Sequence, residues 1–365
     1  MGNSTGSLFR ITTFGESHGG GVGVTIEGCP AGYKIDLLKV QAFLDRRRPG
    51  QSHLSSPRSE LDKVTCLSGL NQDSVSLGTP IMLFVRNKDH RPNDYQDLEQ
   101  VYRPSHADYT TEAKFGIRPA SGGGRASARE TIGRVAAGAV AEQVLEAAIP
   151  GFSVVAYVEA IKGVTAKVED SLQITRSEVE KTPLRCPSKE DYKALEAQII
   201  TAKKKGDSVG GVIYCQVIGC PVGLGEPVFD KLEADLAKSV MSLPACKGFE
   251  IGSGFSGTQL YGSQHNDPFY MEEGRVRTKT NNSGGVQGGI SNGEVIYFRS
   301  AFKPVATIFK KQDSVTAKGE EALFKPHTGR HDPCVLPRAV PIVEASALLV
   351  VMDHFLRQSA LRARP

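Results

Sequence analysis

The sequence has 365 residues, of which 39% are hydrophobic and 23% are charged, so it is long enough to bury a substantial core beneath a polar surface. A formal net charge of only +4 and the lack of tryptophan argue against a nucleic-acid partner, which usually requires a basic stripe and aromatic residues for stacking. The first residues have no apolar secretory segment, and the longest apolar run, 345–352, is too short to span a bilayer, so we expect a soluble, cytoplasmic protein.

Hydrophobic periodicity predicts helices and strands that alternate along the chain. In chain order we expect strands over 21–26 and 81–86, a helix over 127–148, a strand over 154–158, a helix over 189–205, a strand over 212–217, a helix over 227–241, a strand over 295–298 and a helix from 341 to the end. Ser127 and Glu130 have the spacing of a capping box, and Pro227 fits the first turn of the third helix. No regular βαβ rhythm emerges, so the pattern indicates a mixed α/β or α+β fold and leaves the topology open.

The segments between these elements are long, and loops of such length are usually functional. In 14–23 (FGESHGGGVG), His18 lies in a glycine-rich turn before a strand, which suits either a ligand contact or a surface turn with an incidental histidine. Three arginines at 46–48 run into Pro-Gly, so they lie at a turn and face either solvent or a cleft.

The clearest physical signal is 121–131 (SGGGRASARET). A glycine-rich turn there opens onto a capped helix N-terminus, where free N–H groups and the helix dipole favour an anion. Arg125 and Arg129 are one helical turn apart and are expected on the same side. The alternative is an ordinary cap with solvent-facing arginines. Farther along, Asp332 beside Arg330 is compatible with a simple ion pair.

The seven cysteines form no CxxC pair, so we expect reduced thiols and not a disulfide framework. The strongest metal-like grouping places Cys334 near His327, His331 and Asp332, but we expect no metal there.

Nine segments resemble the signatures of the chorismate synthase family, in the order in which that family carries them. They are 14–19 (FGESHG), 44–50 (LDRRRPG), 103–109 (RPSHADY), 122–131 (GGGRASARET), 206–208 (GDS), 225–229 (GEPVF), the glycine loop 284–289, 303–304 (KP) and 329–334 (GRHDPC). Together they cover nearly the whole chain, which makes a chance match untenable.

The resemblance implies a single domain over 1–365 with a β-α-β sandwich fold, usually assembled as a homotetramer. It implies a lyase that eliminates phosphate and a ring hydrogen from 5-enolpyruvylshikimate 3-phosphate in the 1,4-anti sense, giving chorismate, with reduced FMN required but not consumed. Some members reduce their flavin with NADPH. The chemistry agrees, because a substrate with two carboxylates and a phosphate needs several arginines. Its C–H bond is not acidic, so a side-chain base alone would not suffice and a cofactor must supply electron density.

Carried over position by position, the resemblance implies three catalytic residues. His18 resembles the acid that protonates the leaving phosphate, and the ordinary pKa of an imidazole suits that role. His106 resembles the histidine that donates to the N1–C2=O edge of the flavin. Asp332 resembles the carboxylate near flavin N5 that helps to accept the abstracted proton.

The other implied contacts divide between the two ligands. Substrate-binding positions are Arg47, His53, Arg103, Ser127, Arg129 and Arg330. FMN-binding positions are Arg125, Ala126, Ser127, Pro244, Ala245, Gly288, Lys303, Pro304, Val305, Ala306, Thr307 and Arg330. Many relatives have arginine in place of His53, asparagine in place of Pro244 and hydroxyl residues in place of Val305 and Ala306. We therefore expect pH-sensitive substrate binding and a lower FMN affinity, with backbone contacts retained.

Two other interpretations remain open. A flavin-dependent oxidoreductase acting on a small anionic substrate would need a nicotinamide site, yet no GxGxxG lies between a predicted strand and helix. An anion- or RNA-binding module would use the arginine loops without catalysis, and the weak net charge argues against it.

Overall fold

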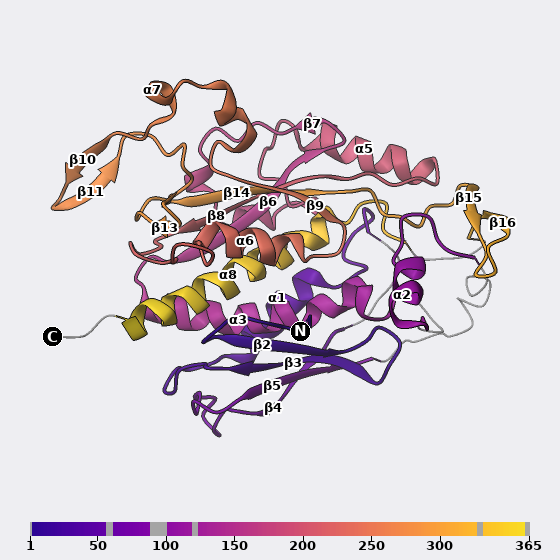
Figure 1. Ribbon diagram of the computed structural model, residues 1–365, viewed down its shortest axis with the longest axis horizontal. Coiled ribbons are helices and arrows are strands. Elements are labelled where there is room, and N and C mark those ends of the chain that lie inside the picture. The colour runs from indigo at the N-terminus through magenta and orange to yellow at the C-terminus, as the bar shows by residue number, and fades with distance from the viewer. Residues whose placement is uncertain (1, 56–60, 88–100, 119–122, 327–330, 362–365) are drawn as a thin grey trace.

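Two antiparallel sheets enclose a layer of helices in the computed structural model, which describes residues 2–55, 61–87, 101–118, 123–326 and 331–361 (Figure 1). In spatial order the first sheet contains β1 (Ser4–Thr5), β2 (Arg10–Gly15), β3 (Gly21–Glu27), β5 (Ile81–Arg86) and β4 (Val64–Ser68). The second contains β7 (Val164–Thr165), β6 (Ser153–Ile161), β8 (Gly211–Ile218), β14 (Ile296–Phe302) and β9 (Cys246–Ile251). Between them lie α1 (Leu37–Arg47), α3 (Thr131–Ala148), α6 (Leu232–Met241) and α8 (Leu336–Leu361). The expected mixed fold class and β-α-β layering are confirmed.

Shorter elements connect or flank these layers. The helices are α2 (Asp108–Phe115), α4 (Arg176–Val179), α5 (Tyr192–Lys204) and α7 (Gly262–His265), and the 3₁₀ turns are η2 (Gly124–Ala126), η3 (Ala128–Glu130), η4 (Ser171–Gln173) and η5 (Gly254–Gln259). Three hairpins pair β10 (Phe269–Glu272) with β11 (Arg275–Thr278), β12 (Val286–Gln287) with β13 (Ile290–Ser291), and β15 (Gln312–Val315) with β16 (Glu321–Phe324). Much of the chain expected to be irregular therefore forms short helices and hairpins.

Helix α3 packs tightly on both sides because glycines face its neighbours. A Cβ at Gly133 would lie 2.9 Å from the carbonyl oxygen of Gly23 in β3. A Cβ at Gly138 would lie 2.6 Å from the Cβ of Ala345 in α8. Non-bonded carbon atoms normally approach to about 3.5–4.0 Å. A larger residue at either position would therefore push α3 away from the first sheet or from α8.

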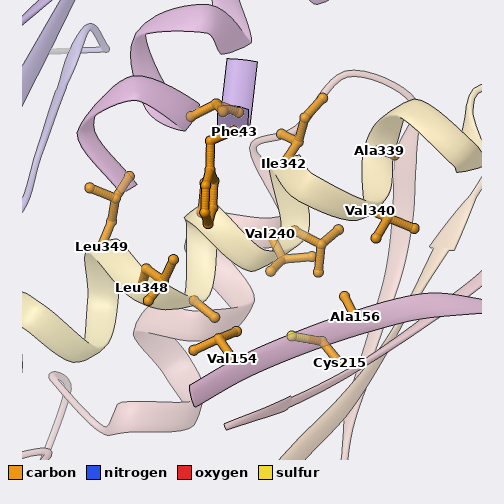
Figure 2. Close-up of a cluster of buried hydrophobic side chains, with 14 of the residues drawn as sticks. Phe43, Val154, Ala156, Cys215, Val240, Ala339, Val340, Ile342, Leu348 and Leu349 are labelled. Atoms are coloured by element: carbon orange, nitrogen blue, oxygen red, sulfur yellow. The ribbon is translucent and has the colours of Figure 1, made fainter. Parts of the chain in front are cut away.

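Helix α8 lies at the centre of the hydrophobic core. Figure 2 shows its side chains between Phe43 of α1 and the second sheet, which contributes Val154, Ala156 and Cys215. By length and composition this helix would suffice to cross a membrane. However, 83% of its most apolar window is buried inside the fold, which is the burial of a core helix.

The capping box predicted for Ser127 and Glu130 does not form. The hydroxyl of Ser127 accepts a hydrogen bond from the backbone N–H of Arg129 at 3.3 Å and so caps η3. The carboxylate of Glu130 accepts instead from Thr13 Oγ1 in β2 at 2.9 Å and from Arg134. Because this 3₁₀ turn comes first, α3 begins at Thr131 rather than at Ser127.

Two further helix starts differ from the prediction. Helix α6 begins at Leu232, because the N–H of Glu226 closes a turn onto the carbonyl of Asp230. Helix α8 begins at Leu336 and contains Pro341, which has no N–H to offer the carbonyl of Pro337 one turn earlier. The guanidinium of Arg185 donates to that carbonyl, so the helix continues through the proline.

A buried carboxylate joins this core helix to its neighbours. The side chain of Glu344 is fully buried and accepts hydrogen bonds from Arg46 of α1 at 2.5 Å and from the backbone N–H of Ala156 at 3.1 Å, while Arg176 Nε lies 3.4 Å away. Burial alone would raise the pKa of Glu344, but the two guanidiniums outweigh burial and hold that pKa below its usual value.

We predict that Glu344→Gln destabilises the fold by about 3–5 kcal/mol, because it leaves Arg46 and Arg176 buried without their shared charge. Since the pKa of Glu344 is lowered, its contribution is present at neutral pH and is lost as the pH falls below about 4. Urea unfolding of the wild type and the variant at neutral pH and in acid measures both effects.

The control is Glu146→Gln, because Glu146 is 41% exposed and lies 3.8 Å from Lys39. This exposed pair should contribute less than about 1 kcal/mol. Equal losses from the two variants would contradict the assignment of Glu344 as a core ion.

Candidate active site

One cavity of about 510 Å³ collects most of the predicted FMN-binding residues. Its lining includes Arg125, Ala126, Pro244, Ala245, Lys303, Pro304, Val305 and Ala306, together with His106. It also includes Gly2, Asn3, Glu130, Arg134, Ser242 and Val335, which were not among the predicted ligand-binding residues. Segments far apart in the sequence thus meet at one opening, with cations on some sides and apolar side chains on others.

Lys303 connects three of these segments. It follows the end of β14, and its backbone N–H donates to the carbonyl of Ala245 at 2.9 Å. Its ammonium donates to the carbonyl of Ser105 at 2.8 Å, beside His106. Burial, with help from Lys247, lowers the pKa of Lys303 below its usual value. Lys303 therefore fixes the 105–107 turn against the second sheet and keeps a cation at the cavity wall.

His106 is held by a carboxylate that also binds an arginine. Asp108, the first residue of α2, accepts from His106 Nδ1 at 2.8 Å and from Arg103 through both oxygens, at 2.6 and 2.7 Å. Burial alone would raise the pKa of Asp108, but the hydrogen bonds from Arg103 and His106 hold that pKa well below its usual value. The side chains of Arg103 and Asp108 are nearly enclosed, so this arrangement is rigid.

Arg125 and Arg129 point in different directions, so the expectation that they share one side of a helix is wrong. Ser127 between them is extended (φ −73°, ψ 145°), which breaks the helical spacing. Arg125 donates to Thr13 and to the carbonyl of Gly15 at the end of β2. Arg129 donates instead to Asn87 and Asp62, in a second cluster whose side chains do not line the cavity.

This second cluster is built on a buried carboxylate shared by two arginines. Asp62 accepts from Arg47 Nη2 at 2.6 Å and from Arg129 Nη1 at 2.8 Å, and its side chain has no exposed surface. Arg47 is also fully enclosed and donates to the carbonyl of Ala128 at 3.1 Å. Burial lowers the pKa of Arg47 to about 10, despite the opposing charge of Asp62. Both groups therefore stay charged at neutral pH.

The turn that carries His18 lies against this cluster. The ring Nδ1 of His18 is 2.9 Å from Ser17 Oγ. Asn87, which follows β5, donates from its amide to the carbonyls of Glu16 and Gly19 at 2.9 and 2.8 Å. The same amide accepts from Arg129 Nε at 2.6 Å. His18 is therefore connected to Arg129 through a single side chain.

Asp332 reaches the cluster from the segment that precedes α8. It forms an ion pair with Arg338, whose Nε donates to the carbonyl of Arg47 at 3.1 Å. The partner considered from sequence, Arg330, lies outside the described residues, as does His327. Cys334 is buried, and burial raises the pKa of its thiol to about 12. All seven cysteines are free, and the described part of the chain holds no group of three side chains suited to a metal.

Three predicted residues lie apart from these contacts. The ring of His53 is 60% exposed and 3.1 Å from Glu196 of α5. Gly288 lies in the turn of the β12–β13 hairpin, and its neighbour Gly289 accepts from the N–H of Leu232 at the start of α6. Thr307 is buried and does not line the cavity.

The cavity and the arginine cluster adjoin through residues 123–130, which contact both. The arrangement offers one opening with cations and apolar walls, and beside it a group of arginines whose charges are partly balanced by buried carboxylates. Such a site can bind a planar anionic cofactor next to a small polyanion, with a histidine at each ligand. Sequence reasoning missed Asp62, Asn87 and Arg338, because no local pattern marks them.

Comparison with known proteins gives one consistent answer. The family model described as Chorismate synthase matches residues 9–356. Curated chorismate synthases of Methylacidiphilum infernorum and Synechococcus sp. (strain WH7803) are 57% and 60% identical to this chain over 365 and 359 residues, which is 99% and 98% of their own lengths. A crystal structure described as a chorismate synthase has a TM-score of 0.75 and 29% identity, covering 96% of this chain and 92% of the other.

We predict that Asp108→Asn lowers the free energy of unfolding by about 1–3 kcal/mol at pH 7, because hydrogen bonds to a charged group are lost. The folded-state pKa of Asp108 is lowered, so its contribution is complete above about pH 4 and shrinks as the pH falls further. The difference between wild type and variant should therefore be smaller at pH 3 than at pH 7 in urea unfolding. Asp313→Asn, at an exposed position on β15, is the control. An equal deficit at both pH values would contradict the lowered pKa.

Proposed function

The chain belongs to the chorismate synthase family, and on that premise we propose how its residues carry out the reaction. The protein is a carbon–oxygen lyase acting on phosphates, which eliminates phosphate from 5-enolpyruvylshikimate 3-phosphate to give chorismate. The full-length match to curated chorismate synthases is the observation that carries this function. No finding favours the oxidoreductase alternative.

We propose that the 510 Å³ cavity binds reduced FMN, and the residues present fit that group. Arg125, Arg134 and Lys303 offer cations for a phosphate, while Ala126, Pro244, Ala245 and Pro304–Ala306 offer apolar contact for a planar ring. The volume lies in the usual range of cofactor sites, about 300–1,000 Å³. Bound reduced FMN supplies electron density while phosphate leaves. His106 is proposed to donate to its N1–C2=O edge, and Gly288, Thr307 and Arg330 remain proposed contacts.

We propose that the arginine cluster beside this cavity binds the substrate. Arg129 of this cluster, together with Arg103 in the separate group around Asp108, is proposed to supply guanidiniums for its phosphate and carboxylates, and Ser127, His53 and Arg330 remain proposed contacts. Arg47 is only 1% exposed, so its contribution is a fixed positive charge behind Arg129. Excluding water from these groups strengthens their attraction for the departing phosphate.

We propose that His18 protonates the leaving phosphate and that Asp332 helps to accept the ring proton. The turn that carries His18 is bound by Asn87, which also contacts Arg129, and this link supports the proposed role. Asp332 is held in place by its ion pair with Arg338. General acid or base catalysis of this kind typically contributes about 10²–10⁴-fold to the rate.

We further propose a cytoplasmic homotetramer that uses a small-molecule substrate, with NADPH as the candidate reductant of its FMN. Sedimentation equilibrium tests the assembly, and a mass of one chain would contradict it. Anaerobic addition of NADPH to the FMN-loaded protein tests the reductant, and an unchanged flavin absorbance would contradict it.

The function itself is tested anaerobically with photoreduced FMN and 5-enolpyruvylshikimate 3-phosphate, with chorismate absorbance and phosphate release followed together. We expect the two products in equal amounts while the flavin stays reduced at the end. FMN binding without product would favour the oxidoreductase alternative, and absence of FMN binding would contradict the proposed cavity.

We predict that His18→Ala lowers kcat by at least about 100-fold, because the departing phosphate then lacks its acid. FMN affinity, measured by fluorescence titration, should stay within about twofold of the wild type. The control is His265→Ala, since His265 contacts Ser253 near the start of η5 and no part of the cavity. A large loss of FMN binding with little change in kcat would contradict the role of His18.

A further inference from the structure

We propose that Asn87 is a positioning residue, which holds the His18 turn in place and ties it to Arg129. This inference rests on the proposed roles of His18 and Arg129. Asn87 is not proposed to contact the substrate or the cofactor. It also lies outside the nine segments that resemble the family signatures.

The contacts of Asn87 converge on the turn that bears His18. Its amide nitrogen donates to the carbonyls of Glu16, Ser17 and Gly19, at 2.9, 3.3 and 2.8 Å. Its backbone N–H donates to the carbonyl of Gly20 at 3.2 Å. Four of the five carbonyls from 16 to 20 are therefore bound by one residue, and the exception is that of His18.

The opposite end of the same amide faces the arginine cluster. Asn87 Oδ1 accepts from Arg129 Nε at 2.6 Å, and Arg129 also donates to the buried carboxylate of Asp62 at 2.8 Å. Asn87 is 9% exposed, so these contacts are largely shielded from water. The rigid, planar amide of Asn87 thus positions the turn of His18 relative to the guanidinium of Arg129.

The chemistry of the turn explains why an amide is suited to this position. Residues 16–20 include two glycines and have few internal hydrogen bonds, so the turn has little means of fixing its own shape. A carboxylate would repel the three carbonyls, and an apolar side chain would leave them without a donor in a place that water reaches poorly. A side-chain amide offers two N–H donors to the turn and a carbonyl acceptor to the arginine.

The functional consequence is a geometric one. Proton transfer to departing phosphate requires the donor within hydrogen-bond reach, and displacement by about 1 Å costs on the order of 100-fold in rate. We therefore expect Asn87→Ala to lower kcat by about 10–100-fold and to raise the substrate KM, because Arg129 also loses a partner. Asn87→Asp keeps an acceptor for Arg129 but removes the N–H donors, so it should lower kcat with a smaller change in KM.

A double-mutant cycle tests whether Asn87 acts through His18. If it does, Asn87→Ala should change kcat by less than about twofold when His18 is already alanine. Additive losses in the His18→Ala, Asn87→Ala double variant would overturn the proposal. A normal kcat for His18→Ala alone would instead count against the proposed catalytic role of His18.

Hydrogen exchange supplies a readout that is independent of turnover. Peptides covering 15–21 should exchange at least about tenfold faster in both Asn87 variants, measured by mass spectrometry on the protein without substrate. Unchanged exchange in this segment would overturn the proposal even if kcat fell. Faster exchange with wild-type kcat would overturn it as well, because the contact would then be merely structural.

The matched control is Asp353→Asn. Asp353 also fixes a turn through three backbone groups, since it accepts from the N–H groups of Ser7, Leu8 and Phe9 at 2.7–2.9 Å. Its substitution should lower thermal stability and speed exchange in 6–10 while leaving the kcat/KM of the reaction within about threefold. A loss of kcat as large as that of Asn87→Ala would show that any loosened turn suffices, which would overturn a specific role for Asn87.

Discussion

The close approach of α3 to β3 on one side and to α8 on the other determines where the active site can form. Gly133 and Gly138 permit that approach, which brings η3 and the start of α3 against β2 and β3. The segment before α3 carries Arg125 and Arg129, and the turn before β3 carries His18. A shift of α3 by the width of a methyl group would separate these loops. The chemistry at the loops therefore depends on two positions in the core that have no side chain.

Charge balance is the second constraint on this site. Binding a polyanion requires several guanidiniums in one place, and like charges at that distance repel one another strongly when buried. The structure resolves this by placing a carboxylate against the arginines: Asp62 lies between Arg47 and Arg129, and Asp108 binds Arg103 and also contacts His106. Each carboxylate also fixes its arginine in one direction. The site is thus pre-organised before any ligand arrives, at the cost of burying ions that would be more stable in water.

Residues that line the cavity were easier to predict from the sequence than the residues that hold those lining residues in place. The resemblance to the family signatures identified most of the cavity walls, because those residues match the family position by position. Asp62 and Asn87 stand in ordinary surroundings, and their partners lie 67 and 42 residues away. Helix starts failed for a related reason: Glu130 prefers Thr13 of β2 to a local cap, and Arg185 supplies the donor that Pro341 lacks. In both of these cases a distant side chain replaced a local partner, whereas α6 starts late because of a local backbone turn between Glu226 and Asp230.

Two of the segments that resemble family signatures, 206–208 and 225–229, contact other such segments and hold them in place. Ser208, in the segment 206–208, donates its hydroxyl to the carbonyl of Val305 at 2.7 Å, and Asp207 pairs with Lys310 at 2.6 Å. The loop 303–307 is therefore held by its backbone, whatever side chains it presents. Gly225 packs closely against the glycine loop 284–289, because a Cβ at Gly225 would lie 2.0 Å from the carbonyl oxygen of Gly289. This explains how Val305 and Ala306 can stand where hydroxyl residues are common. If the backbone contacts of Ser208 fix the path of the 303–307 loop, a substitution of its cavity-facing side chains should alter the strength of the proposed cofactor binding without altering the shape of the site.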